Sequence, residues 1–305
     1  MCWILGRGGL LGSGLRKVLE REGTTEFIPE KRFPWHDTEA CIRNVRDAAK
    51  KFALLTTGKS WYIIWAAGTG TMASTAEDLE RETTVLTSLL NEIASVPDMS
   101  NGSLIYASSA GAVYAGCRDD VITENSVPVP LNPYGEAKLR EEGVLQEFHR
   151  NHPACTVLIA RITNLFGAAQ STMKRQGLIS HIARSILRRE TVNIFVPLDT
   201  IRDYITAESA ADTMLRSIRT LEQGTMLIKI VASEEPTTIA KIIGTFTSIT
   251  KIPPRIVTSA SKLSASYPHR MCFKSIVRPA KQKEQPLLIG ISDVLRAERL
   301  SLQKG

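Results

Sequence analysis

A tyrosine and a lysine four positions apart, Tyr134 and Lys138, lie in a segment with a helical pattern. On a helix, positions i and i+4 share a face, so the phenol and the ammonium group point the same way. A nearby cation favours the phenolate and lowers the pKa of a tyrosine. Such a tyrosine can exchange a proton with a hydroxyl or carbonyl group. Because this spacing is common by chance, the pair by itself would indicate no more than a surface helix.

Two serines, Ser108 and Ser109, come directly after an apolar run upstream of this pair. A hydroxyl group at the end of a strand can polarise the substrate oxygen on which the tyrosine acts. Ligands of parallel sheets bind outside the carboxyl ends of the strands, where these serines are expected. We take Ser109 as the catalytic hydroxyl, with Ser108 as the alternative.

Three glycines at the start of the chain, Gly6, Gly9 and Gly12, form a G-x-x-G-x-x-G pattern between a predicted strand and a predicted helix. Without side chains, the backbone can approach a pyrophosphate, which then lies at the positive end of the helix. The pattern in this position indicates a dinucleotide-binding turn, in which Leu10 and Leu11 open the helix. A glycine-rich turn without a ligand is the competing interpretation.

An acidic residue and two basic residues follow the second predicted strand. Glu30 at its end would accept hydrogen bonds from an adenosine ribose, which favours NAD. Lys31 and Arg32 would instead hold the 2′-phosphate of NADP. The two signals conflict, so the prediction is NAD(P), and an ordinary charged turn is the other interpretation.

The elements that must position these residues alternate between short apolar runs and helical patterns, which is typical of a parallel sheet with crossover helices. The near-continuous hydrophobicity of the runs suits strands that are buried on both faces. We predict strands at 2–5, 24–28, 61–66, 103–107 and 156–160.

Helical spacing of apolar residues connects these strands and continues to the end of the chain. After the glycine turn, we predict helices at 39–51, 76–95, 134–150, 177–189, 205–220, 234–252 and 285–300, with a turn at Pro253-Pro254. The predicted fold class is α/β, a Rossmann-type doubly wound parallel sheet with a smaller C-terminal substrate-binding lobe. We assign 1–167 to an NAD(P)-binding domain to which 201–225 returns, and 168–200 and 226–305 to the lobe.

Composition narrows the class of protein. The 305 residues are 43% hydrophobic and 23% charged, which is ordinary for a soluble globular chain. No apolar stretch reaches the roughly 20 residues of a membrane span. The glycine cluster leaves no room for a secretory signal before the fold, so we expect a cytoplasmic protein. The five cysteines lack C-x-x-C spacing, which predicts free thiols and no metal site.

The net charge of +7 has a local origin, because the stretch 251–283 contains Lys and Arg residues but no Asp or Glu. A basic surface attracts phosphates of any kind. No aromatic-rich or helix-turn-helix pattern accompanies the charge, so we favour an anionic small substrate over nucleic acid.

Several segments together resemble the extended short-chain dehydrogenases/reductases, the NAD-dependent epimerase/dehydratase family. The glycine turn matches the family's opening motif, and Ile64-Trp65-Ala66-Ala67 resembles its H-x-A-A segment along the cofactor. The segment 108–114 resembles S-S-S-x-x-V-Y, and 132–135 matches the approach to the catalytic tyrosine. The resemblance implies cofactor contacts from Gly6, Gly9, Leu10, Leu11, Gly12, Glu30, Arg32, Ala66, Ala67, Gly68, Tyr134 and Lys138.

Three further residues are assigned to the substrate by the same resemblance. Asn164 lies in a segment similar to the family's R-x-x-N-x-Y-G motif, and Arg202 in an R-D-Y-I segment. In the family these positions contact a nucleotide-sugar, which implies that Asn164, Arg202 and Ser109 bind such a substrate. Arg270 is a candidate second ligand for its diphosphate. The resemblance also implies a homodimer formed through 76–95 and 134–150, and a setting in polysaccharide biosynthesis.

The sequence departs from the family at positions that bear on the reaction. The family's catalytic Ser/Thr would fall on Ala110, one residue after Ser109, and the segment Arg81-Glu82-Thr83-Thr84-Val85 stands where the family often has an asparagine. Small residues, Gly111 and Ala112, replace the Asp-Glu pair of sugar dehydratases, which excludes a dehydratase. We therefore predict a nucleotide-sugar epimerase that works through a transient keto-sugar. The alternative is an NADPH-dependent keto-sugar reductase, and a non-catalytic protein of this fold that binds cofactor or RNA is less favoured.

Overall fold

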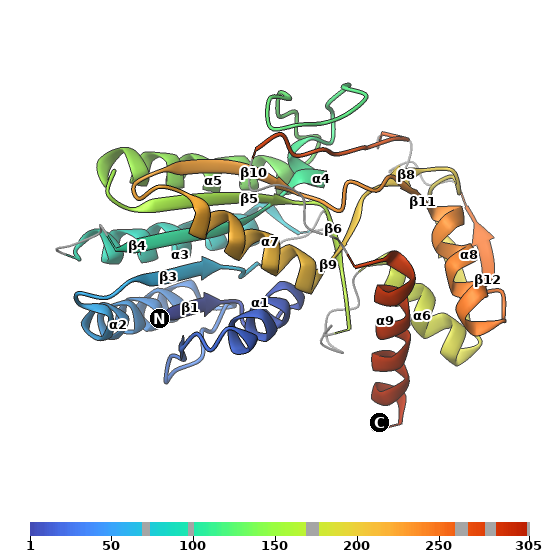
Figure 1. Ribbon diagram of the computed structural model, residues 1–305, viewed down its shortest axis with the longest axis horizontal. Helices are drawn as coiled ribbons and strands as arrows, with labels where there is room; N and C mark the ends of the chain where they lie inside the picture. The colour runs from blue at the N-terminus through green and yellow to red at the C-terminus, as the bar shows by residue number, and fades with distance from the viewer. Residues whose placement is uncertain (69–73, 97–100, 169–176, 260–267, 278–284, 304–305) are drawn as a thin grey trace.

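The computed structural model describes residues 1–68, 74–96, 101–168, 177–259, 268–277 and 285–303. Its centre is a sheet of six parallel strands in the order β10-β5-β4-β3-β1-β2 (Figure 1). The strands are β1 (Cys2–Leu5), β2 (Glu26–Phe27), β3 (Trp61–Trp65), β4 (Gly102–Ser109), β5 (Thr156–Ile162) and β10 (Met226–Val231). This arrangement confirms the predicted Rossmann-type α/β fold.

Helices cover both faces of the sheet, which explains why the strands are apolar throughout. Every residue of β1 and of β5 is buried. One hydrophobic cluster packs the sheet against α1 (Leu10–Arg21) and α7 (Ala207–Thr220). The cluster on the opposite face involves α2 (Thr38–Thr56), α3 (Ala76–Ala94) and α5 (Pro133–Asn151), and the short α4 (Ala110–Val113) follows β4.

The strand order reverses next to β1, because β2 lies on one side of it and β3 on the other. At such a reversal the connections leave the sheet toward opposite faces, which opens a crevice beyond the carboxyl ends of the strands. The backbone confirms that the two strand ends are adjacent, since Ala66 N donates to Leu5 O at 2.9 Å. The glycine turn that follows β1 therefore lies beside the segment that follows β3.

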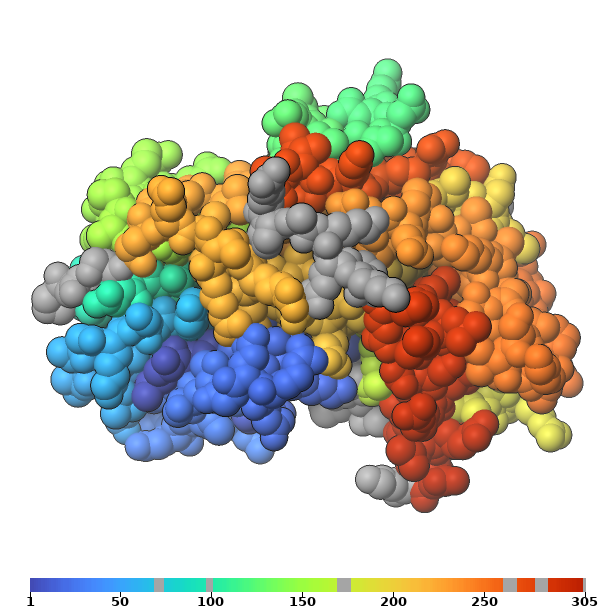
Figure 2. All heavy atoms as spheres, in the orientation of Figure 1, coloured from blue at the N-terminus to red at the C-terminus, as the bar shows by residue number. Residues whose placement is uncertain are grey.

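The second part of the molecule is a lobe with a hydrophobic cluster of its own. In Figures 1 and 2 it occupies the right-hand side, with α9 at its front. It contains α6 (Leu178–Arg188), β7 (Thr191–Ile194), α8 (Ile239–Thr250), β12 (Arg255–Thr258) and α9 (Leu287–Leu302). Two small strand pairs connect it with the sheet: β6 (Asn164–Phe166) with β9 (Tyr204–Thr206), and β8 (Ile201–Arg202) with β11 (Thr237–Thr238).

The predicted domain boundary at residue 225 differs from the structure. The segment 226–231, assigned to the lobe from the sequence, forms β10 and pairs with β5 along its whole length. Its residues Ile230 and Val231 are buried against the sheet core and the loop that covers it. Without a partner strand in view, the sequence of an edge strand does not say which sheet it joins.

Two helices were predicted to start too early, and the second strand was predicted too long. The predicted helix 205–220 begins at Ala207, and the predicted helix 234–252 begins at Ile239, because a threonine caps each start. The side chains of Thr206 and Thr238 accept hydrogen bonds from backbone N–H groups in the first turn. The second strand is limited to Glu26–Phe27, since Pro29 has no N–H group to continue the ladder.

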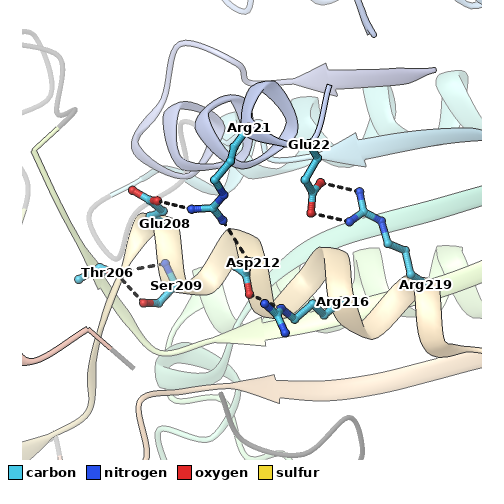
Figure 3. Close-up of polar contacts among 8 residues, drawn as sticks. All are labelled: Arg21, Glu22, Thr206, Glu208, Ser209, Asp212, Arg216 and Arg219. Carbon is cyan, nitrogen blue, oxygen red and sulfur yellow. Dashed lines mark hydrogen bonds and ion pairs between the residues drawn. The ribbon is translucent and has the colours of Figure 1, made fainter. Parts of the chain in front are cut away.

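Helices α1 and α7 are held together by ion pairs as well as by apolar contacts (Figure 3). Arg219 forms a two-pronged contact with Glu22, with both N–O distances at 2.7 Å. Arg21 bridges Glu208 and Asp212, at 3.1 and 3.3 Å. These pairs lie at the protein surface, where water and salt weaken them.

Candidate active site

A cavity of about 200 Å³ lies beyond the carboxyl ends of β1, β3, β4 and β5. It brings together residues from the glycine turn, the segment after β3, the end of β4 and the start of α5. Its described lining is Leu11, Ala66, Ala67, Gly68, Ala107, Ser108, Ser109, Tyr134, Lys138, Ile162, Thr163 and Leu165. The residues predicted to do chemistry thus share one cavity, although up to 127 positions separate them in the sequence, from Leu11 to Lys138.

The glycine turn leaves no space for side chains. Gly6 has a φ of +90°, and a Cβ there would lie 2.3 Å from the carbonyl oxygen of Ala66. A Cβ on Gly12 would lie 2.2 Å from the oxygen of Gly6. Gly9 is the N-cap of α1, so no side chain covers the first N–H groups of the helix. An open helix N-terminus behind a tight glycine turn fits the pyrophosphate of a dinucleotide.

The two serines at the end of β4 have different partners. The Ser108 hydroxyl is buried and donates to Glu142 Oε1 at 2.6 Å. Ser109 is the N-cap of α4, and its hydroxyl interacts with Tyr134 across the cavity, which lowers the pKa of the phenol. The geometry therefore favours Ser109 over Ser108 as the hydroxyl that meets a substrate.

Tyr134 is placed by the start of α5. Asn132 caps this helix by accepting a hydrogen bond from Gly135 N at 2.9 Å, and Pro133 occupies its first turn. Burial raises the pKa of Tyr134 above its ordinary value, and this effect exceeds the lowering by Lys138 and Ser109. The structure thus differs from the lowered pKa predicted from the Tyr-x-x-x-Lys spacing.

The surroundings of Lys138, which is 4% exposed, add to the effect of burial on Tyr134. Its Nζ contacts Glu82 Oε1 at 2.8 Å and Glu141 Oε2 at 2.9 Å. Burial lowers the pKa of Lys138, but Tyr106 and the two carboxylates outweigh it and hold this pKa well above its usual value. The carboxylates also add to the rise at Tyr134. Sequence reasoning noted Glu82 only as a departure from a family pattern and did not identify Glu141. The i+3 spacing from Lys138 to Glu141 is the one signal that could have found it.

A second buried ion pair lies behind Ser108. Arg161 contacts Glu142 through Nε at 3.0 Å and through Nη2 at 2.6 Å. Its Nη1 donates to the Tyr114 hydroxyl at 2.5 Å. Arg161 opens the predicted R-x-x-N segment, and its side chain here connects β5 to α5 beneath the cavity.

The residues predicted to select between NAD and NADP lie on the surface. Glu30 pairs with Lys51 of α2 at 2.8 Å and lines a separate hollow of about 670 Å³ between α2 and the segment after β2. The Arg32 side chain is exposed. Nearer the glycine turn, Arg7 makes a two-pronged contact with Glu26 of β2, at 2.9 and 3.2 Å. The described lining of the larger hollow contains no predicted catalytic group.

Apart from Ser109, the residues assigned to the substrate lie near one another but outside the described cavity lining. Asn164 Nδ2 donates to Asp203 O at 2.7 Å. Arg202 is half-buried, and its Nη1 donates to Ile201 O at 2.8 Å. Backbone hydrogen bonds on both sides of Arg270 join its segment to Ile201, so the structure brings the two predicted arginines to one place.

In the described part of the chain, no helix is long and apolar enough to cross a bilayer. Among the same residues, no group of three or more His, Cys, Asp or Glu side chains is arranged to hold a metal ion.

Comparisons with known proteins agree with this geometry. Residues 2–229 match the model of the NAD dependent epimerase/dehydratase family. A UDP-glucose 4-epimerase of Azospirillum brasilense is 33% identical over 130 residues, which are 38% of this chain and 37% of the relative. The chain covers 37% of the length of each of the two curated relatives that it matches.

Solved structures resemble the chain over almost its whole length. MoeE5 in complex with UDP-glucose and NAD superposes with a TM-score of 0.81 at 19% identity, covering 99% of both chains. RMD from Pseudomonas aeruginosa, complexed with NADPH, gives a TM-score of 0.79 at 18% identity, covering 98% of this chain and 97% of RMD. At this identity the likeness concerns the fold. With the family match, it shows that the chain belongs to the NAD-dependent epimerase/dehydratase family.

Proposed function

We propose that this protein is a nicotinamide-dependent epimerase that inverts a hydroxyl-bearing carbon of a nucleotide-sugar. The observation that carries the proposal is the shared cavity, in which Ser109, Tyr134 and Lys138 lie beside the glycine turn. The names of the relatives support the class of substrate, since one is a UDP-glucose 4-epimerase and one neighbour holds UDP-glucose.

Each residue of the cavity has a role in the proposed reaction. Ser109 donates a hydrogen bond to the reacting oxygen of the sugar, and Tyr134 takes the proton from its hydroxyl group. Lys138 is close to the Tyr134 ring, with its Nζ 5.6 Å from the centroid, and stabilises the phenolate that proton transfer requires. When bound, the nicotinamide supplies an acceptor for the carbon-bound hydride and gives the hydride back. The keto-sugar would turn before the hydride returns to its opposite face, and Tyr134 returns the proton to the oxygen, so the carbon is inverted with no net oxidation.

The glycine turn and Lys138 are the groups proposed to hold the cofactor. The N–H groups at the start of α1 would bind the pyrophosphate, and the third N–H of Lys138 is available for a ribose hydroxyl beyond its two carboxylate contacts. The cofactor would extend along the carboxyl ends of the strands, where it would also contact Leu10, Ala67 and Gly68. Asn164, Arg202 and Arg270 are proposed to hold the nucleotide-sugar from the side of the lobe.

A keto-sugar reductase is the second candidate. Burial raises the pKa of Tyr134, which favours the neutral phenol, and a neutral phenol is the form that donates a proton to a ketone. RMD, which is complexed with NADPH, is a structural neighbour consistent with this alternative. The two reactions differ in whether cofactor is consumed.

The test begins with mass spectrometry of the native protein, to identify any nicotinamide and nucleotide-sugar that co-purify. The protein is then incubated in D₂O with UDP-, dTDP- and GDP-sugars, and the products are analysed by NMR. An epimerase gives a changed configuration without deuterium at the inverted carbon and without net change in cofactor absorbance. Stoichiometric loss of NADPH would replace the epimerase proposal with the reductase.

Tyr134→Phe removes the proton carrier and should reduce turnover by about a thousandfold. Tyr62→Phe is the matched control, because Tyr62 lies on β3 outside the cavity lining and should leave turnover unchanged. If Tyr134→Phe turns over at the wild-type rate, both catalytic proposals are wrong and the cavity only binds its ligand.

A further inference from the structure

The charges around Lys138 do not balance. Glu141 accepts hydrogen bonds from Lys138 and Tyr106 on Oε2, and the Thr83 hydroxyl lies 3.3 Å from its Oε1. An ionised carboxylate can accept all of these hydrogen bonds. Glu82 contacts the same ammonium group. Two carboxylates against one ammonium leave one negative charge in a buried cluster.

Glu82 carries the uncompensated part of this charge. The residue is 4% exposed, and its Oε2 has no hydrogen-bond partner among the described residues. Leaving a buried carboxylate oxygen unpaired is costly unless a bound group compensates for it. Among the described residues, Glu82 Oε2 therefore stays available to a bound group.

The position of Glu82 shows where a bound group that meets its carboxylate would lie. A Cβ added to Gly68 would be 3.1 Å from Glu82 Oε1, so the carboxylate is in contact with the backbone of the segment after β3. Gly68 and Lys138 both line the cavity that contains Tyr134. The negative charge thus borders the space proposed for the nicotinamide half of the cofactor.

We propose that Glu82 is a specificity-determining residue that makes the cofactor site prefer the oxidised, positively charged nicotinamide over the reduced, neutral form. This inference rests on the proposed nicotinamide-dependent function. The oxidised ring carries a positive charge, and the reduced ring carries none. A buried negative charge beside the site stabilises only the first, and the low polarity of the surroundings strengthens this difference. Lys138 alone would have the opposite effect, and Glu82 and Glu141 together reverse it.

The preference has a consequence for the reaction. An epimerase begins by oxidising its substrate, so its resting form must hold the oxidised cofactor. A reductase begins with the reduced cofactor and would be hindered by the same charge. Glu82 therefore favours the epimerase over the reductase within this fold.

The test compares the dissociation constants of NAD⁺ and NADH, and of NADP⁺ and NADPH, by isothermal titration calorimetry at about pH 8, well above the ordinary range of carboxyl groups. Cofactor that co-purifies is first removed. The wild-type protein should bind the oxidised form more tightly. Glu82→Gln keeps the size of the side chain but removes its charge, and should shift the ratio of the two constants about tenfold toward the reduced form.

Glu92→Gln is the matched control. Glu92 lies on the same helix about three turns further on and pairs with Arg46 at the surface side. This variant should keep the wild-type ratio. Circular dichroism confirms that each variant is folded; if Glu82→Gln is not, Glu141→Gln removes the second charge of the cluster and should shift the ratio in the same direction.

Two results would overturn the inference: a wild-type protein that binds the reduced form as tightly as the oxidised form, or a Glu82→Gln variant in which both constants change by the same factor. If none of the four cofactor forms binds the wild-type protein, the proposed function itself is wrong. The two failures are therefore distinguishable.

Discussion

Two successive glutamates of α5 occupy buried clusters of different charge balance. Glu142 faces one cation, Arg161, and also accepts a hydrogen bond from Ser108, while Arg161 donates to the Tyr114 hydroxyl. Glu141 shares one cation, Lys138, with a second carboxylate. The first cluster is electrically complete and connects β5 to α5. The second is incomplete and borders the cavity. Charge balance therefore separates a structural ion pair from a binding site, even between adjacent residues.

The largest effect on stability is expected from breaking the balanced cluster. Glu142→Gln leaves the buried guanidinium of Arg161 without its counter-ion, and should lower the free energy of unfolding by about 3–5 kcal/mol. Urea unfolding measures the change. Glu147→Gln, on an exposed position of the same helix, is the control. A loss no larger than that of the control would show that Arg161 does not need its partner.

Removing one carboxylate from the cluster around Lys138 should change the stability less. Glu141→Gln keeps an acceptor for Tyr106 and leaves Lys138 paired with Glu82 alone, so the free energy of unfolding should change by less than about 1 kcal/mol. The same urea experiment tests this. A loss as large as that of Glu142→Gln would mean that the two clusters are equally structural, and the comparison would fail.

The pH dependence of the same variant sharpens the contrast. Burial raises the folded-state pKa of Glu141 above its ordinary value of 4.5, and Lys138 offsets this only in part. Between the two values the native protein binds more protons than the unfolded chain, so stability falls as pH rises. The difference in free energy of unfolding between the wild type and Glu141→Gln measures this contribution. The contribution is fully present below the unfolded pKa and is lost as pH rises through the folded pKa. A difference that stays constant or grows as pH rises above the unfolded pKa would contradict the raised pKa.

The smallest effect is expected at the surface pairs between α1 and α7. Glu22→Gln removes the two-pronged contact with Arg219 (Figure 3), whose partners are about one-third exposed, and should cost about 0.5–1 kcal/mol. Glu208→Gln removes a more exposed contact with Arg21 and should cost still less. Thermal unfolding at low and high salt measures both, and the loss for Glu22→Gln should shrink as salt is raised. A loss that is independent of salt would mean that packing, not charge, holds this contact.

Much of the fold could be predicted because its signals are local. The predicted strand 2–5 and the predicted helices 76–95 and 134–150 agree with β1, α3 and α5 to within one residue at each end. These elements have strong patterns and clear boundaries, such as Thr75 at the start of α3. The starts of α7 and α8 were misplaced because a short strand, β9 or β11, ends in each threonine cap and was not separated from the helix that follows. The homodimer and the cytoplasmic location stay predictions.

Only part of the candidate site could be predicted from the sequence. Tyr134, Lys138 and Ser109 have recognisable spacing and precede or follow predictable elements. Glu82 belongs to another helix, and nothing in the sequence says that its carboxylate meets Lys138, 56 positions away. The predicted direction of the Tyr134 pKa shift was wrong mainly because the depth of burial of the phenol is not visible in the sequence, and secondly because the two counter-ions of Lys138 are not.

The sequence by itself determined the class of fold, the glycine turn and the order of the catalytic residues, because these depend on neighbours within a few positions. The tertiary structure decided which groups face one another: Ser109 and not Ser108 toward Tyr134, Glu30 toward α2, and two carboxylates toward one lysine. Electrostatic energy depends on distance and burial, which are set by packing between elements that are distant in the chain. The charge of the site is therefore a property of the folded molecule.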